Sequence, residues 1–329
     1  MKKLSIIFIF LILGKLCNAQ QLAQISQYFS NNILYNPAFA GSVETIVIAS
    51  NYRRQWTGIE EAPVTQTLFG HGYVGQNMGL GLSIHNDATG PSRLTGFNFS
   101  TAYHLLLQEK NDLTLSLGLS GSLYQFKIDL DKIEFDVAED PVIYEENGSK
   151  LTPDATFGLL LYSDHYYGGF SIPNLVQSQS NLFEVSNKSD NQLQRHYILT
   201  GGYDYKLEGH DITLKPSLLG KYLPGVPMQF DFTFRSEYSF SSHRNRFHPS
   251  QAQSIDEKSA WIGVSYRTGD AIVAMAGVNY KFVTFGYSYD ITVSNVKLYS
   301  GGTHEISLGM QLKNDLKRTG DKRNKRRKK

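Results

Sequence analysis

The chain has 329 residues with a single cysteine, a hydrophobic share of 41% and a formal net charge of +2. One cysteine excludes a disulfide framework and any cluster of thiolate metal ligands. Beyond the first residues, no apolar run reaches the ~18 residues of a transmembrane helix, which excludes a membrane protein built from helices.

The N-terminus has the pattern of an export signal. Two lysines precede an apolar run over residues 4–13, and a small-residue cleavage site follows that ends at Ala19. We therefore expect a signal peptide over residues 1–19, whose removal leaves a mature chain without cysteine. Leu16 before Cys17 does not suit a lipoprotein site, so lipidation is the minor alternative.

Residues 20–42 follow neither a helical nor a strand period. This segment is rich in Gln and Asn and closes with LYNPAFAGS. Pro37 bars Asn36 from helical geometry and lacks a backbone donor, so the pair predicts a corner before the first strand. The polar run suits a wet interior, and small residues up to Gly41 permit close approach of other backbones. If the rest of the chain forms a β-barrel, we expect residues 20–42 to plug its lumen from the periplasmic side.

From residue 43 to residue 312 the hydrophobic pattern has the two-residue period of β-strands. In DLTLSLGLSGSL, residues 112–123, every leucine falls on one face, while the other face carries serine, threonine and glycine. We predict about fourteen strands of ~8–14 residues. They begin near residues 43, 62, 77, 93, 112, 152, 165, 193, 211, 228, 260, 271, 281 and 303.

This pattern favours an all-β fold, a transmembrane outer-membrane β-barrel of antiparallel strands. The expected strands are long enough to cross a bilayer at a tilt, and an even count is typical of outer-membrane barrels. No segment has the pattern of a helix that could cover a face of the sheet. Closure of the sheet into a barrel gives every strand two hydrogen-bonded neighbours, which the backbone needs in the hydrocarbon of a membrane. A soluble β-protein, in which two apolar sheet faces pack together, is the alternative.

The connections between strands test the barrel independently. If both termini are periplasmic, the connections that follow odd-numbered strands are extracellular and long. The two longest of these, over residues 126–151 and 173–192, fit this rule. Residues 241–259 do not, because this long segment falls on the short-turn side. It is either a periplasmic excursion or the sign of a miscounted strand.

The loop over residues 126–151 combines many acidic side chains with apolar ones. A merely solvated loop would not need the apolar residues. We expect either a surface that binds a partner protein or a loop that packs over its own barrel mouth. The residues assigned to the partner-binding surface are Asp129, Asp131, Glu134, Phe135, Asp136 and Tyr144.

Little in the sequence points to catalysis. The nine histidines are scattered without a metal-ligand spacing, and we expect neither a metal nor another cofactor. His104 lies on the polar face of its predicted strand and could pair with a serine of GLSGS, residues 118–122, but this stretch is no nucleophile elbow. A barrel hydrolase is therefore a remote alternative to a protein that is not an enzyme.

The chain ends in a basic tail, residues 313–329, with ten Lys or Arg against two Asp. The body over residues 20–312 is acidic, with 19 basic and 28 acidic side chains. A block of like charges predicts a solvated tail, and the alternative is that it holds an acidic partner or membrane phosphates in the periplasm. Because an exported chain does not meet nucleic acid, we expect no nucleic-acid partner.

Four blocks of sequence, taken in their order along the chain, are distinctive. They are QISQYFSNNILYNPAFAGS (24–42), YRRQWTGIEEAPVTQTL (52–68), LKPSLLGKYLPGVPMQFDF (214–232) and FGYSYDITVSNVKLYSGGTHEISLGMQL (285–312). Together they resemble the PorP/SprF family of the type IX secretion system, which implies an outer-membrane barrel related in form to the fatty-acid-channel barrels. The matching signature positions are Asn36, Pro37, Gly41, Arg54, Gln55, Trp56, Pro63, Tyr287, Tyr289, Asp290, Gly302, His304 and Glu305.

The resemblance implies a function in the secretion or surface anchoring of a partner adhesin with a type B C-terminal domain, of the kind used in gliding motility. The implied partners are this adhesin, other type IX secretion components and outer-membrane lipid. Asp290, His304 and Glu305 flank the last expected extracellular loop. We expect them to form a charged cluster at the outer rim that either fixes the loop or binds the cargo.

A passive channel for small solutes is the main alternative function. An open lumen lined by Asp231, Arg235 and Glu237 would favour such a channel. An occluded lumen with a protein-binding outer surface would favour the anchor.

Overall fold

The computed structural model describes residues 23–109, 111–129, 132, 149–179, 192–240 and 258–316. The predicted signal peptide therefore lies outside the described residues, as do residues 241–257 and 317–329. The described ranges form fourteen long β-strands and the two-residue strand β9. Their bounds are β1 (Ile46–Arg54), β2 (Val64–Gly75), β3 (Met78–Thr89), β4 (Ser92–Gln108), β5 (Leu113–Ile128), β6 (Ser149–Tyr162), β7 (Tyr166–Ile172), β8 (Tyr197–Tyr203), β9 (Tyr205–Lys206), β10 (Ile212–Tyr222), β11 (Gln229–Ser239), β12 (Lys258–Arg267), β13 (Ala271–Tyr280), β14 (Val283–Thr292) and β15 (Thr303–Leu312).

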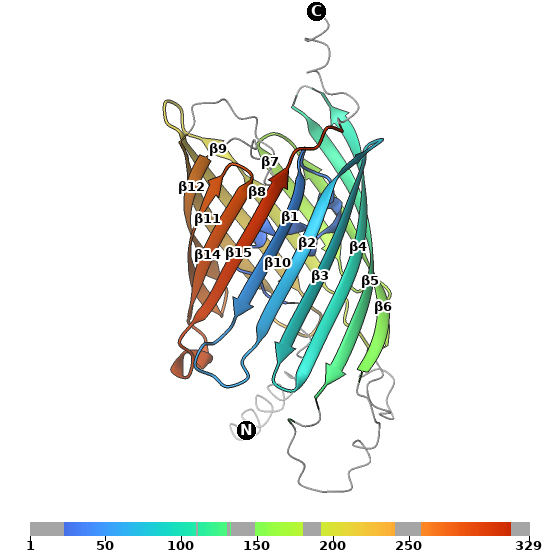
Figure 1. Ribbon diagram of the computed structural model, residues 1–329, viewed down its shortest axis with the longest axis vertical. Helices are drawn as coiled ribbons and strands as arrows, with labels where there is room; N and C mark the ends of the chain where they lie inside the picture. Colours follow the sequence, from blue (N-terminus) through green and yellow to red (C-terminus); the bar gives the residue numbers. More distant parts are fainter. Residues whose placement is uncertain are drawn as a thin grey trace, which may run out of the picture.

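The strands close into a barrel (Figure 1). Each long strand pairs antiparallel with its neighbours in chain order, and β1 pairs with β15, from Ile46 opposite Leu312 to Arg54 opposite His304. The short β9 follows β8 and pairs with β10. Closure gives each long strand two partners, as hydrocarbon requires. The predicted fourteen-stranded barrel is confirmed, and every predicted start lies within four residues of an observed one.

The two faces of the barrel wall have opposite character. Along β13 exposed and buried residues alternate without exception, and the exposed ones are Ile272, Ala274, Ala276, Val278 and Tyr280. On β5, Leu119 is 52% exposed whereas Ser116 and Ser120 are buried. An apolar outer face around a polar interior is the pattern of a barrel in lipid and the reverse of a soluble sandwich. Among the described residues, no helix is long and apolar enough to cross a membrane.

The two ends of the barrel differ in their connections. At the end that we call the turn end, most of the connections between strands are tight turns. Between β2 and β3, for example, Gln76 and Asn77 have φ of 52° and 61°, as a two-residue hairpin turn requires. The other end, the loop end, carries longer connections such as residues 55–63 and 293–302. The loop end is at the bottom of Figure 1. All fourteen expected strands are found, and β11 ends and β12 begins at the turn end, so no strand was miscounted.

The N-terminal segment over residues 23–42, here called the lumenal segment, lies inside the barrel (blue in Figure 1). It contains three short 3₁₀ helices, η1 (Tyr28–Ser30), η2 (Asn32–Leu34) and η3 (Pro37–Phe39). Phe39 packs with Phe69 and Leu160 of the wall, and Phe29 packs edge-on against Trp261, with 5.4 Å between ring centroids. The buried apolar core of the protein is therefore the contact between this segment and the inner wall.

The lumenal segment also crosses more of the lumen than the sequence led us to expect. Ser26 contacts residues near the loop end, and Gly41 contacts Gly79 beside the β2–β3 turn at the turn end. The chain thus runs along the barrel towards the turn end, where β1 begins, and is not a plug confined to one mouth.

Candidate functional site

Buried charge gathers at one place in the lumen, which we call the lumenal charge cluster. It consists of Arg53 (β1), Asp231 (β11), Arg267 (β12), Asp290 (β14) and Glu305 (β15), none more than 1% exposed. Arg53 Nη2 lies 2.9 Å from Asp290 Oδ2, and Nη1 lies 3.1 Å from Glu305 Oε2. Arg267 Nε lies 2.8 Å from Asp231 Oδ1, and Nη1 lies 2.9 Å from Asp290 Oδ2. The cluster thus links the two sides of the point at which the barrel closes.

The lumenal segment completes this cluster. Three carboxylates face two guanidinium groups, and backbone N–H groups compensate part of the excess negative charge. Ser26 N donates to Glu305 Oε2 (2.7 Å) and Gln27 N donates to Oε1 (2.9 Å). The Ser26 hydroxyl lies 2.8 Å from both carboxylate oxygens of Asp290 and accepts from Arg53 Nη1 (2.7 Å) and Arg267 Nη2 (3.0 Å). Because buried charges are costly unless they are paired and hydrogen-bonded, segment and cluster stabilise each other.

Asn36 makes a second attachment at the Asn-Pro corner. Its Oδ1 accepts from Ala38 N (2.9 Å) and so caps η3, which begins with the following proline. Its Nδ2 donates to the carbonyl oxygen of Leu159 in β6 (2.9 Å). The wall has a glycine at the contact, because a Cβ on Gly158 would overlap the Asn36 side chain. The missing side chain of Gly158 thus leaves a notch in the wall, and the corner predicted from the sequence is the point at which the segment fits into it.

The turn end of the segment is held by Gly41 and His104. Gly41 has a φ of 66° and lies so close to Gly79 of β3 that a Cβ on either residue would overlap the backbone of the other. His104 Nε2 lies 2.9 Å from the carbonyl oxygen of Ala40, and Nδ1 lies 3.1 Å from the hydroxyl of Tyr162. One ring nitrogen therefore contacts the lumenal segment and the other contacts the wall, which gives His104 a structural role.

The signature residues near the last loop divide between two faces of the wall. Asp290 and Glu305 lie in the lumenal charge cluster, whereas His304 lies on the outer face. There its Nδ1 is 2.7 Å from the Tyr287 hydroxyl, and its ring centroid is 5.0 Å from that of Tyr289. Successive side chains of a strand point to opposite faces, so His304 and Glu305 cannot share a cluster. The expected single cluster of three residues at the outer rim is not formed.

Two loops at the loop end are joined beside the signature residue Gly302. Thr57 N donates to the carbonyl oxygen of Gly302 (2.8 Å), and Gly301 N donates to that of Thr57 (2.6 Å). Residues 55–63 and 293–302 are thereby held together. Four more signature positions make hydrogen bonds in or beside these loops: Gln55, Trp56, Pro63 and Tyr289. Arg54 is exposed on the outer face, opposite His304 in the strand register.

Ser26, Arg53 and Arg267 were not among the site residues predicted from the sequence. A signal for Arg53 was present, because it shares the strand face of Val47 and Asn51, both buried, while the neighbouring Arg54 shares the exposed one. A charged side chain on the inward face of a barrel strand needs a lumenal partner. No pattern in the sequence identifies that partner as Ser26.

Asp129 and Lys132 of the candidate partner-binding loop lie within the described residues. Asp129 N donates to the carbonyl oxygen of Pro91 (2.9 Å). Lys132 Nζ lies 2.8 Å from Glu61 Oε1, and this hydrogen bond raises the pKa of the lysine. Outside the described residues lie Asp131, Glu134, Phe135, Asp136 and Tyr144. Within the described ranges, no group of three or more His, Cys, Asp or Glu could hold a metal ion.

Several solved structures are similar to this chain. A FadL homologue of Pseudomonas aeruginosa has a TM-score of 0.47 and 12% identity, over 91% of this chain and 95% of that one. The monoaromatic hydrocarbon channel CymD has a TM-score of 0.45 and 12% identity, over 87% and 93% of the two chains. Omp33 of Acinetobacter baumannii has a TM-score of 0.40 and 10% identity, over 83% and 100%.

No curated protein matches the chain. A family model does match: that of the type IX secretion system membrane protein PorP/SprF covers residues 17–310, nearly the whole chain. With the closed barrel and its apolar outer face, this match places the protein in the outer membrane. The chain therefore belongs to the PorP/SprF family of type IX secretion system membrane proteins.

Proposed function

We propose that this barrel supports the secretion or surface anchoring of a partner adhesin with a type B C-terminal domain, without catalysing a reaction itself. The family membership supports a barrel of the type IX system. The observation that carries the finer proposal is the occupied lumen, because a barrel filled by its own chain is suited to binding at its ends and not to conducting solutes.

The residues that would line an open channel are all engaged. Asp231 pairs with Arg267, and the Arg235 guanidinium lies 3.7 Å from the ring centroid of Phe29 in the lumenal segment. Glu237 is paired with Lys215 at 3.1 Å. A route for solutes through this region would require the segment to leave its partners. The passive-channel alternative therefore has no support from these side chains.

The loop end is the surface that we assign to the partner. Barrels of this class expose their long loops outside the cell. Residues 55–63 and 293–302 form one joined surface there, on which Leu298 and Tyr299 are each 76% exposed. Exposed aromatic and aliphatic side chains of this kind are typical contact residues in protein interfaces. We assign the acidic loop to the same surface, with Phe135 as an apolar contact.

Affinity purification from outer membranes tests the proposal. The tagged wild-type protein is extracted in mild detergent and its bound proteins are identified by mass spectrometry. We expect an adhesin and type IX components with the wild type, and at least tenfold less adhesin with the double variant Phe135→Ala/Tyr144→Ala. Tyr280→Ala, an exposed aromatic of the turn end, is the matched control. Recovery of neither an adhesin nor a type IX component with the wild type would reject the proposed function.

A further inference from the structure

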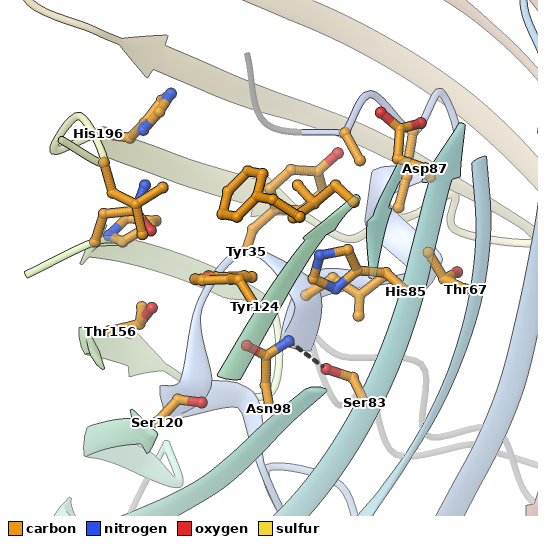
Figure 2. Close-up of a pocket in the computed structure, with 18 of the residues that line it drawn as sticks. Tyr35, Thr67, Ser83, His85, Asp87, Asn98, Ser120, Tyr124, Thr156 and His196 are labelled. Atoms are coloured by element: carbon orange, nitrogen blue, oxygen red, sulfur yellow. Dashed lines mark hydrogen bonds between the residues drawn. The ribbon is translucent and has the colours of Figure 1, made fainter. Parts of the chain in front are cut away.

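A cavity of about 380 Å³ lies between the lumenal segment and the inner wall formed by β2 to β6 (Figure 2). Its volume is within the range of small-molecule sites, ~300–1,000 Å³. Thr89, Ser92 and Ile128 line it, and these residues lie where strands begin or end at the loop end. Pro37 of the lumenal segment lines its inner part. The cavity therefore opens towards the loop end and is closed by the segment.

The cavity has two chemically different sides. On the side of the lumenal segment the lining is apolar, with Ile25, Ile33, Leu34 and Pro37. The barrel wall opposite presents the small polar side chains of Ser83, Asn98, Ser120 and Thr156 deeper in the cavity, and the apolar ones of Leu94, Phe126 and Ile128 near the strand ends at the mouth. Figure 2 shows the rings of Tyr35, His85 and Tyr124 around the shared space, and Asn98 Nδ2 donates to Ser83 Oγ at 3.0 Å. An apolar side that faces a polar one is suited to a ligand with both characters.

Two buried polar atoms of the lining have no protein partner. Thr67 is 5% exposed and Asn174 is 6% exposed, and both line the cavity. In the part of the chain that the structure describes, Thr67 Oγ1 and Asn174 Oδ1 have no hydrogen-bond partner. Both atoms are closed off from the cavity in the structure, so a ligand could form a hydrogen bond with either of them only after the side chain rotates towards the cavity.

The charge of the lining limits the ligand further. Three of its residues carry full charges, Asp87, Arg93 and Lys127, and all three lie near strand ends at the mouth. Their signs are mixed, and the described lining below the mouth offers no lysine, arginine or carboxylate. A strongly charged ligand would lose its hydration there without gaining a counter-charge. The site favours a neutral molecule.

We propose that this cavity binds a small, neutral amphipathic molecule, with an apolar ring or short chain against the lumenal segment and hydroxyl or amide groups towards the wall. The ligand enters from the loop end. Since the segment is tethered at Ser26 and Asn36, the cavity is a blind site and not a passage. This binding activity is separate from the proposed adhesin function and does not require it.

Photo-crosslinking of the full-length protein in lipid nanodiscs tests the site. The probe is 4-benzoylbenzyl alcohol, a neutral aromatic alcohol, and cross-linked peptides are mapped by mass spectrometry. We expect cross-links to peptides that contain residues 33–37 and Tyr124. Ser120→Phe, which fills the cavity, is expected to lower these cross-links at least tenfold. Leu119→Phe, the adjacent residue on the outer face, should leave them unchanged.

Two results would overturn the site. One is labelling confined to outer-face peptides, and the other is equal labelling of the residue 33–37 peptides in the Ser120→Phe and Leu119→Phe proteins. If Ser120→Phe fails to insert, Thr156→Leu gives the same test from β6. Loss of adhesin recovery in Ser120→Phe without probe labelling in the wild type would also overturn it, since a protein segment would then be the occupant. Probe binding with no adhesin recovered would leave the site standing and reject only the proposed function.

Discussion

Arg53 and Asp290 form a 2.9 Å ion pair between two strands that are not neighbours, β1 and β14, across the intervening β15. Glu305 on β15 forms an ion pair with the second terminal nitrogen of the same guanidinium group. This contact spans the seam at which the first and last strands meet, and Ser26 of the lumenal segment is hydrogen-bonded into it. Closure of the barrel and occupation of its lumen are thus coupled through one arginine.

Replacing this arginine should therefore destabilise the protein strongly. Arg53→Leu leaves Asp290 and Glu305 buried with one partner fewer, and breaking a buried pair in this way costs about 3–5 kcal/mol. We expect the free energy of unfolding to fall by that amount in urea titrations in detergent micelles, followed by tryptophan fluorescence. Arg54→Leu, the adjacent exposed arginine, should change it by no more than about 0.5 kcal/mol. Equal effects of the two substitutions would contradict the role of the cluster.

Removal of the lumenal segment should open the barrel. Deleting residues 24–40 removes the side chains that fill the interior and leaves the strands unchanged. We expect a faster influx of a small sugar into proteoliposomes, measured by swelling, than with the wild type. A deletion of residues 317–329 serves as the control and should leave the influx at the wild-type rate. The 24–40 deletion variant must still show the heat-dependent gel shift of a folded barrel. If its influx is then the same as that of the wild type, the lumenal segment does not plug the barrel.

The strands could be predicted because their signal is local. On β5 the leucines and the serines alternate along the sequence and so fall on opposite faces of the strand. In the barrel one face meets lipid and the other meets the polar interior, which matches this two-residue period. Boundaries were less accurate where the first residues of a strand lack an apolar alternation. β6 begins at Ser149 and β8 at Tyr197, three and four residues from their expected positions.

The site was less predictable because its contacts are not local. The alternation on β15 already separates His304 from Glu305, so the proposed rim cluster could have been corrected from the sequence alone. The meeting of Ser26 with Asp290 could not, since these residues are 264 positions apart and meet only once the barrel has closed. The path of the lumenal segment likewise depends on Gly158, a notch in a strand far along the chain.

That notch gives a third prediction. Gly158→Ala places a Cβ against Asn36, and overpacking of this kind costs about 1–3 kcal/mol. We expect a lower free energy of unfolding together with a measurable rise in sugar influx, because the segment loses its fit at the corner. Gly168→Ala is the matched control, since a Cβ there meets nothing within 4 Å. If both substitutions left influx unchanged, the notch would not be what seats the segment.

The joined loops give a fourth prediction, which separates the outer surface from the lumen. Gly302 has a φ of 91°, and a Cβ there would overlap the ring of Tyr289. Gly302→Ala should therefore displace the 293–302 loop and break the hydrogen bond from Thr57. We expect proteinase K, added to intact cells, to cleave residues 55–63 and 293–302 several times faster than in the wild type.

Gly209→Ala controls for backbone strain alone. Gly209 also has a positive φ, 75°, but a Cβ there meets nothing within 4 Å, and it lies in a turn at the opposite end. A non-glycine residue in this region of φ costs about 1–2 kcal/mol at either position. The two variants differ in their location and in the contact with Tyr289, which only a Cβ at residue 302 would make. Sugar influx should stay at the wild-type rate in both, because neither residue touches the lumenal segment. Cleavage of the loops at the same rate in Gly302→Ala and Gly209→Ala would show that the signature glycine does not hold the two loops together.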